Sequence, residues 1–389
     1  MLPFLAQHLL EGLWGPFRLL ESRLVLSFLG CISCAFFTWI LLPRFWDRMP
    51  HDRGKAFVKG SEAARGKPTG AGLLMTGVFL VCAFFVMPFY GEYALIGCAL
   101  FAIMLTGYLD DRSSTDWGQL KKGAFDLLIS LFAAWVIAKW QGTTIWLPFI
   151  KGTLPGGAIL LPTWAFVLGG AALLWIMINV VNCSDGVDAV AGSLALYGLF
   201  AMGALLYACL GHEIVAKYLI LPHVENGASW GIVLFTACGG LAAYLWYNAP
   251  PSQVLMGDAG SRFYGLLLGI AVLVAGNPFL FLVAAPILFV NGGAGLVKLL
   301  LLRGLKKCGL DTRPPLSSVD NPINPKNFAT DEEAERQHPV VKLLHKYRFP
   351  IHDHCRKNMG WSNPQVLVRF MLLQTLLMPL FAIIMIKLR

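Results

Sequence analysis

Long apolar runs recur along this chain of 389 residues and constrain its fold more than any other feature. A helix needs about 20 apolar residues to cross the roughly 30 Å hydrocarbon core of a membrane, and fewer where neighbouring helices shield it. The runs predict an all-α, polytopic integral membrane protein with about ten transmembrane helices in a single transmembrane domain, residues 1–389. The eighth and ninth runs could also form one broken helix. The candidate spans are residues 23 to 42, 70 to 88, 91 to 107, 124 to 140, 161 to 182, 189 to 209, 229 to 247, 262 to 276, 278 to 302 and 364 to 387.

Composition excludes other classes of protein. Hydrophobic residues make up 57% of the chain and charged residues 14%, against roughly 45–50% and about 25% in soluble domains. A soluble enzyme is therefore excluded. Most of the nine cysteines lie inside apolar runs, where a thiol behaves as a small hydrophobic group rather than as half of a disulfide. The Cys31 and Cys34 pair also lies inside a run, so we assign it no redox role.

Basic residues fall almost entirely in alternate loops. Of the 31 lysines and arginines, 22 lie in the loops after the first, third, seventh and ninth spans. The loop after the seventh span contributes one of them, Arg262. Because such residues concentrate in cytoplasmic loops, both termini should be periplasmic. Residues 303–363 would then form a long cytoplasmic loop, in which Asp331 to Tyr347 are compatible with a helix. This topology explains the net charge of +9 without nucleic-acid binding.

Acidic residues are scarce, 22 in all, and three groups of aspartates stand out at the ends of predicted spans. A carboxylate near the bilayer is a functional candidate, because its burial there is costly. The predicted topology brings all three groups to the cytoplasmic face, with Asn182 and Asn248 nearby. Such oxygen ligands suit Mg²⁺ with a phosphorylated substrate, although any one cluster could merely cap its helix. The three groups are Asp110 and Asp111, Asp185 and Asp188, and Asp258.

Two glycine-containing segments favour phosphate binding. In GDAGS, residues 257–261, small residues let the backbone approach a ligand. Ser261 begins a helix there, and the N-terminal amides of a helix favour anions. In GKPTGAG, residues 66–72, Lys67 either contacts a phosphate or anchors the span at the cytoplasmic side. Thr69 belongs to the same candidate substrate-binding segment.

A histidine pair lies in PIHDH, residues 350–354. His352 and His354 could bind a transition metal or donate hydrogen bonds to a diphosphate. Together with Cys355, the two histidines would offer three zinc ligands. No second ligand pair with suitable spacing occurs in the sequence. The diphosphate is therefore favoured over zinc.

The order of these segments resembles that of the phospho-N-acetylmuramoyl-pentapeptide transferase family, within the superfamily of polyprenyl-phosphate N-acetylhexosamine-1-phosphate transferases. The resemblance covers residues 66–370. PIHxH followed by KxxGWxxPxVxVRF is particular to this family, whereas the other motifs belong to the whole superfamily. The matching segments are GKPTGAG, GYLDD with Lys121 and Lys122 after it, NVVNCSDGVDAVAGS, YNAPPSQVLMGDAGS and RFPIHDHCRKNMGWSNPQVLVRF.

The resemblance implies transfer of phospho-MurNAc-pentapeptide from its UDP carrier to undecaprenyl phosphate. The products would be UMP and lipid I, which serves peptidoglycan synthesis and hence cell shape and cell division. The resemblance also implies a homodimer in the bacterial cytoplasmic (inner) membrane, with the active site facing the cytoplasm. Mg²⁺ would be the cofactor, with Asp258 as its principal ligand and Asp185 as a second.

Further roles carry over by position from the family's pattern. Asp110 and Asp111 would lie beside the diphosphate, one of them aligning or deprotonating the acceptor phosphate, and His352 and His354 would hold the diphosphate or the sugar. Direct attack on the β-phosphorus is favoured over a covalent intermediate on Asp110, because a phosphate with a second pKa near ~6 is already mostly dianionic. The substrate-binding residues would be Lys67, Thr69, Lys121, Asn182, Asp185, Asp188, Asn248 and Ser261.

Three departures from the family's pattern mark this chain. Asp353 replaces the middle histidine of the usual HHHFE, Ala64 stands where a lysine is usual, and the loop at 303–349 is longer. The altered histidine motif keeps open the transfer of another N-acetylhexosamine phosphate, from a donor such as UDP-GlcNAc. A non-enzyme alternative is an inactive paralogue or a lipid-carrier transporter, which the costly carboxylates disfavour.

Overall fold

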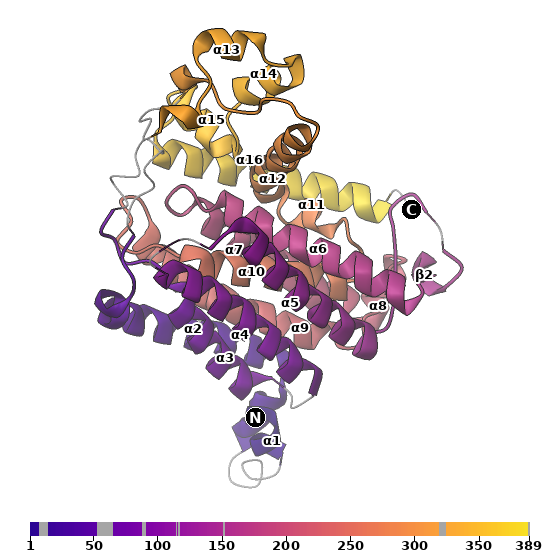
Figure 1. Ribbon diagram of the computed structural model, residues 1–389. Coiled ribbons are helices and arrows are strands. Elements are labelled where there is room, and N and C mark those ends of the chain that lie inside the picture. The colour runs from indigo at the N-terminus through magenta and orange to yellow at the C-terminus, as the bar shows by residue number, and fades with distance from the viewer. Residues whose placement is uncertain are drawn as a thin grey trace.

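A bundle of long helices forms the body of the protein (Figure 1). The computed structural model describes residues 1–7, 15–52, 65–87, 91–113, 115, 117–150, 152–318 and 324–387. Each predicted span corresponds to one long helix, so the all-α polytopic fold is confirmed. The long helices are α2 (Arg23–Phe45), α3 (Gly72–Val86), α4 (Gly91–Arg112), α5 (Gln119–Trp140), α6 (Thr163–Ser184), α7 (Val190–Ala204), α9 (Gly227–Asn248), α10 (Gly257–Val274), α12 (Pro286–Lys307) and α16 (Asn363–Lys387).

Short elements connect the long helices. Strands β1 (Thr144–Ile145) and β2 (Ile159–Leu160) pair antiparallel. A π-helical turn, Leu205–Leu210, continues α7. The short α-helices are α1 (Leu2–Leu5), α8 (Glu213–Tyr218), α11 (Leu280–Ala284), α13 (Asp331–Arg336), α14 (Pro339–Lys346) and α15 (Ile351–Lys357), and the 3₁₀ turns are Gly15–Glu21, Trp46–Arg48, Pro155–Gly157, Leu316–Ser318 and Pro325–Asn327.

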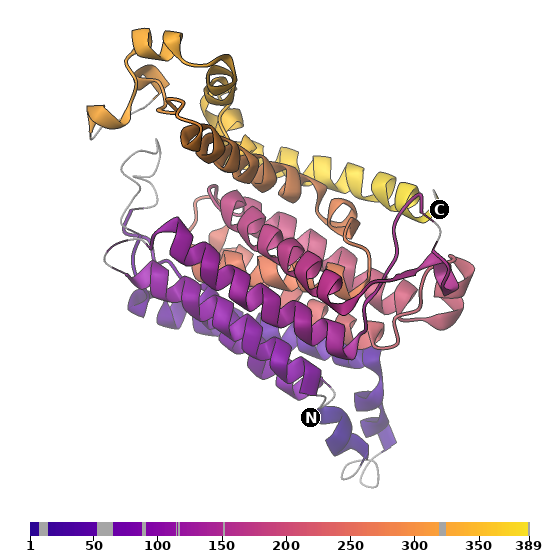
Figure 2. The same cartoon turned by 45° about the vertical axis from the view of Figure 1, so that its right-hand side comes forward.

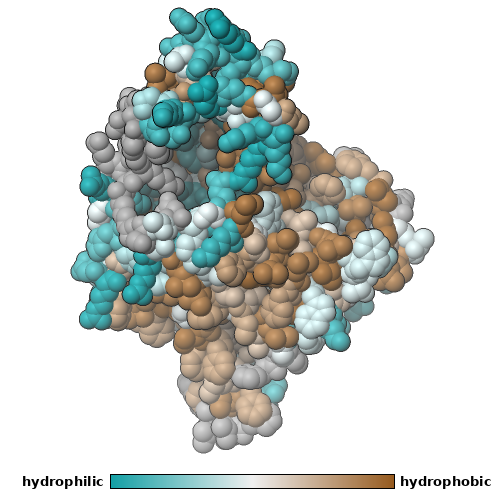
Figure 3. Space-filling model, in the orientation of Figure 1, coloured by the Kyte–Doolittle hydropathy of each residue, from teal (hydrophilic) through white to brown (hydrophobic). Residues whose placement is uncertain are grey.

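The bundle has the length and surface of a membrane domain. Among the described residues, nine helices are long and apolar enough to cross a bilayer, and α3 is a shorter apolar helix of 15 residues. On the face shown in Figure 3, hydrophobic residues cover most of the bundle, whereas hydrophilic residues gather over the segment that contains α13 and α14 and along one edge of the bundle. Only 11% of the apolar stretch of α16 is buried within the chain. Surrounding lipid would cover the remaining apolar surface.

Helix α10 lies at the centre of the bundle, and 89% of its apolar stretch is buried. Two glycines let neighbouring helices approach its first turn. A Cβ atom on Gly72 of α3 would lie 2.0 Å from the backbone nitrogen of Gly260, and one on Gly107 of α4 would lie 2.6 Å from the carbonyl carbon of Asp258. Small residues permit such close packing. Asp258 is therefore fixed where α3, α4 and α10 meet.

The eighth and ninth spans are separate helices, and their starts differ from the prediction. The ninth begins at Pro286 rather than at residue 278, because Ala285 has a non-helical backbone (φ −147°, ψ 56°) and proline suits a first helical turn. The eighth begins at Gly257 rather than at residue 262. Its polar first turn lies outside the apolar run, and side chains of neighbouring helices hold that turn in place.

Within the segment at 303–363, α13 and α14 stand away from the bundle, at the end opposite the C-terminal end of α16 (Figure 2). The helix-compatible run from Asp331 to Tyr347 forms two short helices, α13 and α14. Helix α13 ends at Arg336 and α14 begins at Pro339, because proline starts a helix readily but interrupts one from within. A capping box between Thr330 and Glu333 fixes the start of α13.

Candidate active site

One lysine joins two of the predicted catalytic carboxylates. The Nζ atom of Lys122 lies 3.0 Å from Oδ2 of Asp258 and forms an ion pair with Oδ2 of Asp110. The other oxygen of Asp110 accepts a hydrogen bond from the backbone N–H of Trp117 at 2.7 Å. These side chains come from α5, α10 and α4. They bring together the ends of two consecutive helices, α4 and α5, and of α10, which is far from both in the sequence.

An asparagine of α6 completes this arrangement. The Nδ2 group of Asn182 donates to Oδ1 of Asp258 and to Oγ of Ser261, both at 3.0 Å. Ser261 is fully buried, and its hydroxyl donates to the carbonyl of Gly257 at 3.0 Å. Ser261 therefore orients Asn182 from inside the bundle. We refer to Asp110, Lys122, Asn182 and Asp258 as the Lys122 cluster.

Asp111 holds the first turn of α10. Its two carboxylate oxygens accept hydrogen bonds from the backbone N–H groups of Asp258 at 3.0 Å and Ala259 at 3.1 Å. The sequence predicts that the N-terminal amides of this helix attract an anion, and here the anion is a side chain of the protein itself. Asp111 therefore fixes the backbone that carries Asp258.

A buried ion pair joins α5 and α10 one turn deeper. The Nε and Nη2 atoms of Arg262 donate to Oδ1 of Asp126, and both side chains are at most 3% exposed. Arg262 follows Asp258 by one turn, and Asp126 follows Lys122 by one turn, so each pair of residues shares a helix face. The placement of Arg262 in a loop is therefore wrong. Because breaking a buried pair costs ~3–5 kcal/mol, this pair holds the two helices in register.

A second group of residues surrounds the loop after α6. The side-chain amide of Asn248 forms hydrogen bonds with two backbone groups. Its Oδ1 accepts from the N–H of Ala189 and its Nδ2 donates to the carbonyl of Val254, both at 2.7 Å. The Nζ atom of Lys67 donates to Oγ of Ser252 at 2.9 Å, and the N–H of Ser252 points to Oδ2 of Asp188 at 3.4 Å. The structure thus brings Lys67 beside the predicted aspartate loop.

His352 of α15 packs against that loop. A Cβ atom on Gly186 would lie 2.5 Å from Nε2 of His352. On the other side, Nδ1 lies 3.1 Å from Nδ2 of Asn291, whose Oδ1 accepts from the N–H of His352 at 2.9 Å. Because the Asn291 amide nitrogen can only donate, Nδ1 is the acceptor and the ring proton is on Nε2. The ring therefore presents an N–H donor toward Gly186.

Burial lowers the pKa of His352 to about 4, which keeps its ring neutral near pH 7. A histidine whose pKa falls on folding binds fewer protons in the native state than in the unfolded state. The free energy of unfolding should therefore decrease, by up to about 3 kcal/mol, as the pH falls from 6.5 toward 4. Thermal unfolding in detergent should show that the unfolding temperature falls more steeply with decreasing pH in the wild type than in His352→Gln. Equal pH slopes for the two proteins would contradict this account.

The other residues of the histidine motif have different surroundings. The ring of His354 lies 5.8 Å from that of Tyr347, and its buried Nδ1 has no hydrogen-bond partner among the described residues. No group of three or more histidines, cysteines or acidic residues in the described part of the chain comes together as a metal site. Zinc at His354 and Cys355 therefore gains no support. The assignment of Mg²⁺ to Asp258 and Asp185 stays a prediction.

Other predicted residues are placed less centrally. The ammonium of Lys121 lies over the ring of Trp117, 3.5 Å from its centroid, while the neighbouring Lys122 pairs with the carboxylates. Thr69 is buried, with its N–H donating to the carbonyl of Pro50 at 2.8 Å. Asp185 ends α6. Ala64 lies outside the described residues.

Sequence reasoning assigned no role to two residues of this region. Lys122 carried a weak signal, because it adjoins the predicted Lys121 and the GYLDD motif. Asn291, which holds His352, is an isolated amide in an apolar helix, and polar groups inside membrane helices are functional candidates.

Comparison with known proteins gives the family. The family model described as Glycosyl transferase family 4 matches residues 93–276. A protein of Treponema pallidum (strain Nichols), named phospho-N-acetylmuramoyl-pentapeptide-transferase, is 39% identical over 367 residues, which cover 94% of this chain and 90% of that one. This chain belongs to the phospho-N-acetylmuramoyl-pentapeptide-transferase family. Proteins of the same name from Aquifex aeolicus (strain VF5) and Campylobacter lari are 25% and 27% identical; the matches cover 98% and 84% of this chain and 98% and 83% of theirs.

Membership of the phospho-N-acetylmuramoyl-pentapeptide-transferase family agrees with the geometry of the site. The matched range of residues 93–276 contains every member of the Lys122 cluster, together with Asp111 and the buried pair below it. His352 and His354 lie outside that range.

Proposed function

We propose that this protein transfers phospho-MurNAc-pentapeptide from its UDP carrier to undecaprenyl phosphate, releasing UMP and forming lipid I. The reaction would take place at the cytoplasmic face of the bacterial inner membrane, and the family resemblance supports a homodimer. The observation that carries the proposal is the Lys122 cluster, in which one ammonium lies between two carboxylates at the end of a membrane bundle. The membership of the family supports the muramoyl donor.

The donor atoms of the cluster fit Mg²⁺. The ion prefers carboxylate oxygens and is commonly held by one or two carboxylates together with substrate phosphates. Asp258 offers such oxygens, and the ammonium between Asp258 and Asp110 indicates that a cation is favoured there. We propose Asp258 as the principal ligand and Asp185 as a second. When bound, the ion would neutralise charge on the diphosphate of the donor.

The chain's own residues position and neutralise the reacting groups. An oxygen of the acceptor phosphate attacks the β-phosphorus of the donor, a new P–O bond forms, and the bond from the β-phosphorus to the bridging oxygen breaks so that UMP leaves. Lys122 would donate to phosphate oxygens as charge moves toward UMP. Both oxygens of Asp110 are engaged, by Lys122 and by the N–H of Trp117, which favours direct attack over an Asp110 intermediate.

His352 and His354 would hold the diphosphate or sugar end of the donor. The neutral ring of His352 offers an Nε2–H donor beside the aspartate loop. The buried Nδ1 atom of His354 has no partner in the described part of the chain, and a substrate group that reached it would supply one. Asp353 replaces a family histidine between them, so donor selectivity is the property to test first.

Release of UMP by the purified protein tests this function. With undecaprenyl phosphate and Mg²⁺ present, we expect UMP from UDP-MurNAc-pentapeptide and not from UDP-GlcNAc. Release of UMP from UDP-GlcNAc alone would instead assign the protein to the N-acetylhexosamine-1-phosphate transferases of the same superfamily that use that donor. A folded protein that releases UMP from neither donor would contradict the proposal.

A further inference from the structure

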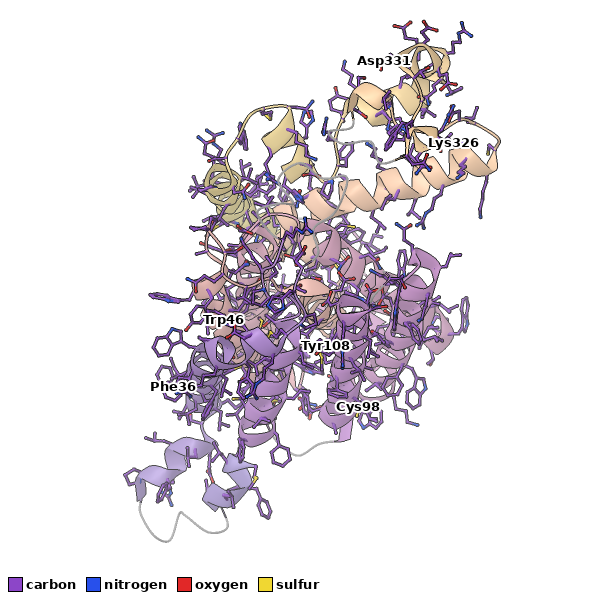
Figure 4. The ribbon with its side chains drawn as sticks, turned by 60° about the vertical axis from the view of Figure 1, so that its left-hand side comes forward. Phe36, Trp46, Cys98, Tyr108, Lys326 and Asp331 are labelled. Carbon is purple, nitrogen blue, oxygen red and sulfur yellow. The ribbon has the colours of Figure 1, made fainter. Side chains whose placement is uncertain are left out.

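An apolar groove lies outside the active site, along helices α2 and α3. It encloses a volume of about 560 Å³. One wall is a helical stripe of Phe37, Leu41 and Phe45 on α2, and Tyr108 of α4 contributes at one end. Trp46 and Tyr108 lie nearer to the α13 end of the molecule than Phe36 and Cys98 do (Figure 4). The groove therefore begins at the same end of the bundle as the Lys122 cluster.

A glycine opens the other wall of the groove. A Cβ atom on Gly77 of α3 would meet no heavy atom within 4 Å, so the missing side chain leaves free space. Val81, one turn further along α3, is 58% exposed, and Phe37 opposite is 47% exposed. The groove thus opens along its length to the surroundings of the bundle. Within a bilayer those surroundings are acyl chains.

Arg48 provides a positive charge at the end of the groove. It is the one cationic side chain among the described lining residues, and its guanidinium lies 5.4 Å from the centroid of the Phe45 ring. Arg44 is also exposed, one turn before it. A guanidinium matches a phosphate group in charge and geometry. An apolar channel that ends at an arginine is complementary to an anionic lipid.

We propose that this groove binds an anionic phospholipid, with one acyl chain beside Gly77 and its phosphate at Arg48. The groove opens toward the bilayer, and no contact among the described residues connects Arg48 to Lys122. A structural phospholipid is therefore favoured over the lipid acceptor of the reaction. This inference does not depend on the proposed function.

A bound chain would also support the active site. Tyr108 lines the groove and packs near Gly70. A Cβ atom on Gly70 would lie 3.4 Å from the ring of Tyr108 and 3.5 Å from Oδ2 of Asp111. The segment of Lys67 runs directly into Gly70. Lipid packed against Tyr108 would therefore limit the movement of this segment.

A pair of glycine substitutions tests the site. Gly77→Phe fills the groove, whereas Gly169→Phe adds the same side chain to an exposed position of α6 where a Cβ atom also meets nothing within 4 Å. Retained phosphatidylglycerol would be measured by native mass spectrometry on the full-length protein in detergent. We expect Gly77→Phe to retain at least about tenfold less lipid than the wild type, and Gly169→Phe to retain as much.

A charge substitution tests the head-group assignment. Arg48→Gln should weaken retention of phosphatidylglycerol about fivefold and reduce its preference over phosphatidylcholine. Equal retention by Gly77→Phe and wild type, or no preference between the two lipids in the wild type, would overturn the proposal. Undecaprenyl phosphate retained in place of phosphatidylglycerol, and lost in Gly77→Phe, would assign the groove to the acceptor instead. Matched unfolding temperatures would establish that each variant is folded.

Discussion

Asp258→Asn should reduce turnover by about a thousandfold or more while the protein stays folded in the membrane. Asp258 links two other members of the Lys122 cluster, since it pairs with Lys122 and accepts a hydrogen bond from Asn182. Asparagine has nearly the same shape and can still accept from Asn182. It loses the charge that pairs with Lys122 and that would hold Mg²⁺. The UMP-release assay at saturating Mg²⁺ measures the effect.

The control for Asp258→Asn is the same change at a remote aspartate. Asp331 is exposed in the first turn of α13, outside the bundle (Figure 4). Asp331→Asn should keep wild-type turnover. If Asp258→Asn also kept Mg²⁺-dependent turnover close to the wild-type value, the assignment of the site would be wrong.

Lys122→Met should lower kcat by about a hundredfold or more, because the lysine supplies the donor that we place on the phosphate oxygens. Its neighbour provides a matched control. Lys121 lies over the ring of Trp117 instead of between carboxylates, so Lys121→Met should lower kcat by less than about tenfold. Equal losses in the two variants would contradict the distinction between the adjacent lysines.

Cation binding gives a second, independent measurement on Lys122→Met. In the wild type the ammonium occupies the space between Asp110 and Asp258. Its removal leaves two carboxylates without a counter-charge, which favours a divalent cation. Mn²⁺ titrated without substrate should bind more tightly to Lys122→Met than to the wild type. Weaker binding would show that Lys122 does not compete for this position.

The sequence was sufficient for the membrane fold because a span leaves a long apolar signal. It failed where a polar turn continues a helix, as at the start of α10. There the helix is extended by hydrogen bonds from Asp258 and Ala259 to Asp111, a residue more than a hundred positions earlier. No local sequence pattern around residue 257 predicts a contact with so distant a residue. The break between α13 and α14, in contrast, has a local cause in the sequence, because Pro339 starts the second helix.

The candidate site was predictable in its residue types and less so in its contacts. Scarce carboxylates at one predicted face identified Asp110, Asp111 and Asp258, and all three meet at the first turn of α10. The choice between Lys121 and Lys122 depends on which way each side chain points from α5. Burial of Asn248, which holds two loops through backbone groups, likewise depends on tertiary packing.

The mass of the lipid product tests the central claim most directly. The wild-type protein would receive undecaprenyl phosphate, Mg²⁺ and an equimolar mixture of UDP-MurNAc-pentapeptide and UDP-GlcNAc, with Asp258→Asn as the inactive control. We predict a single lipid product with the mass of lipid I, formed in equal amount to UMP and absent with the variant. A product carrying only N-acetylglucosamine, or no product from folded protein, would contradict the account.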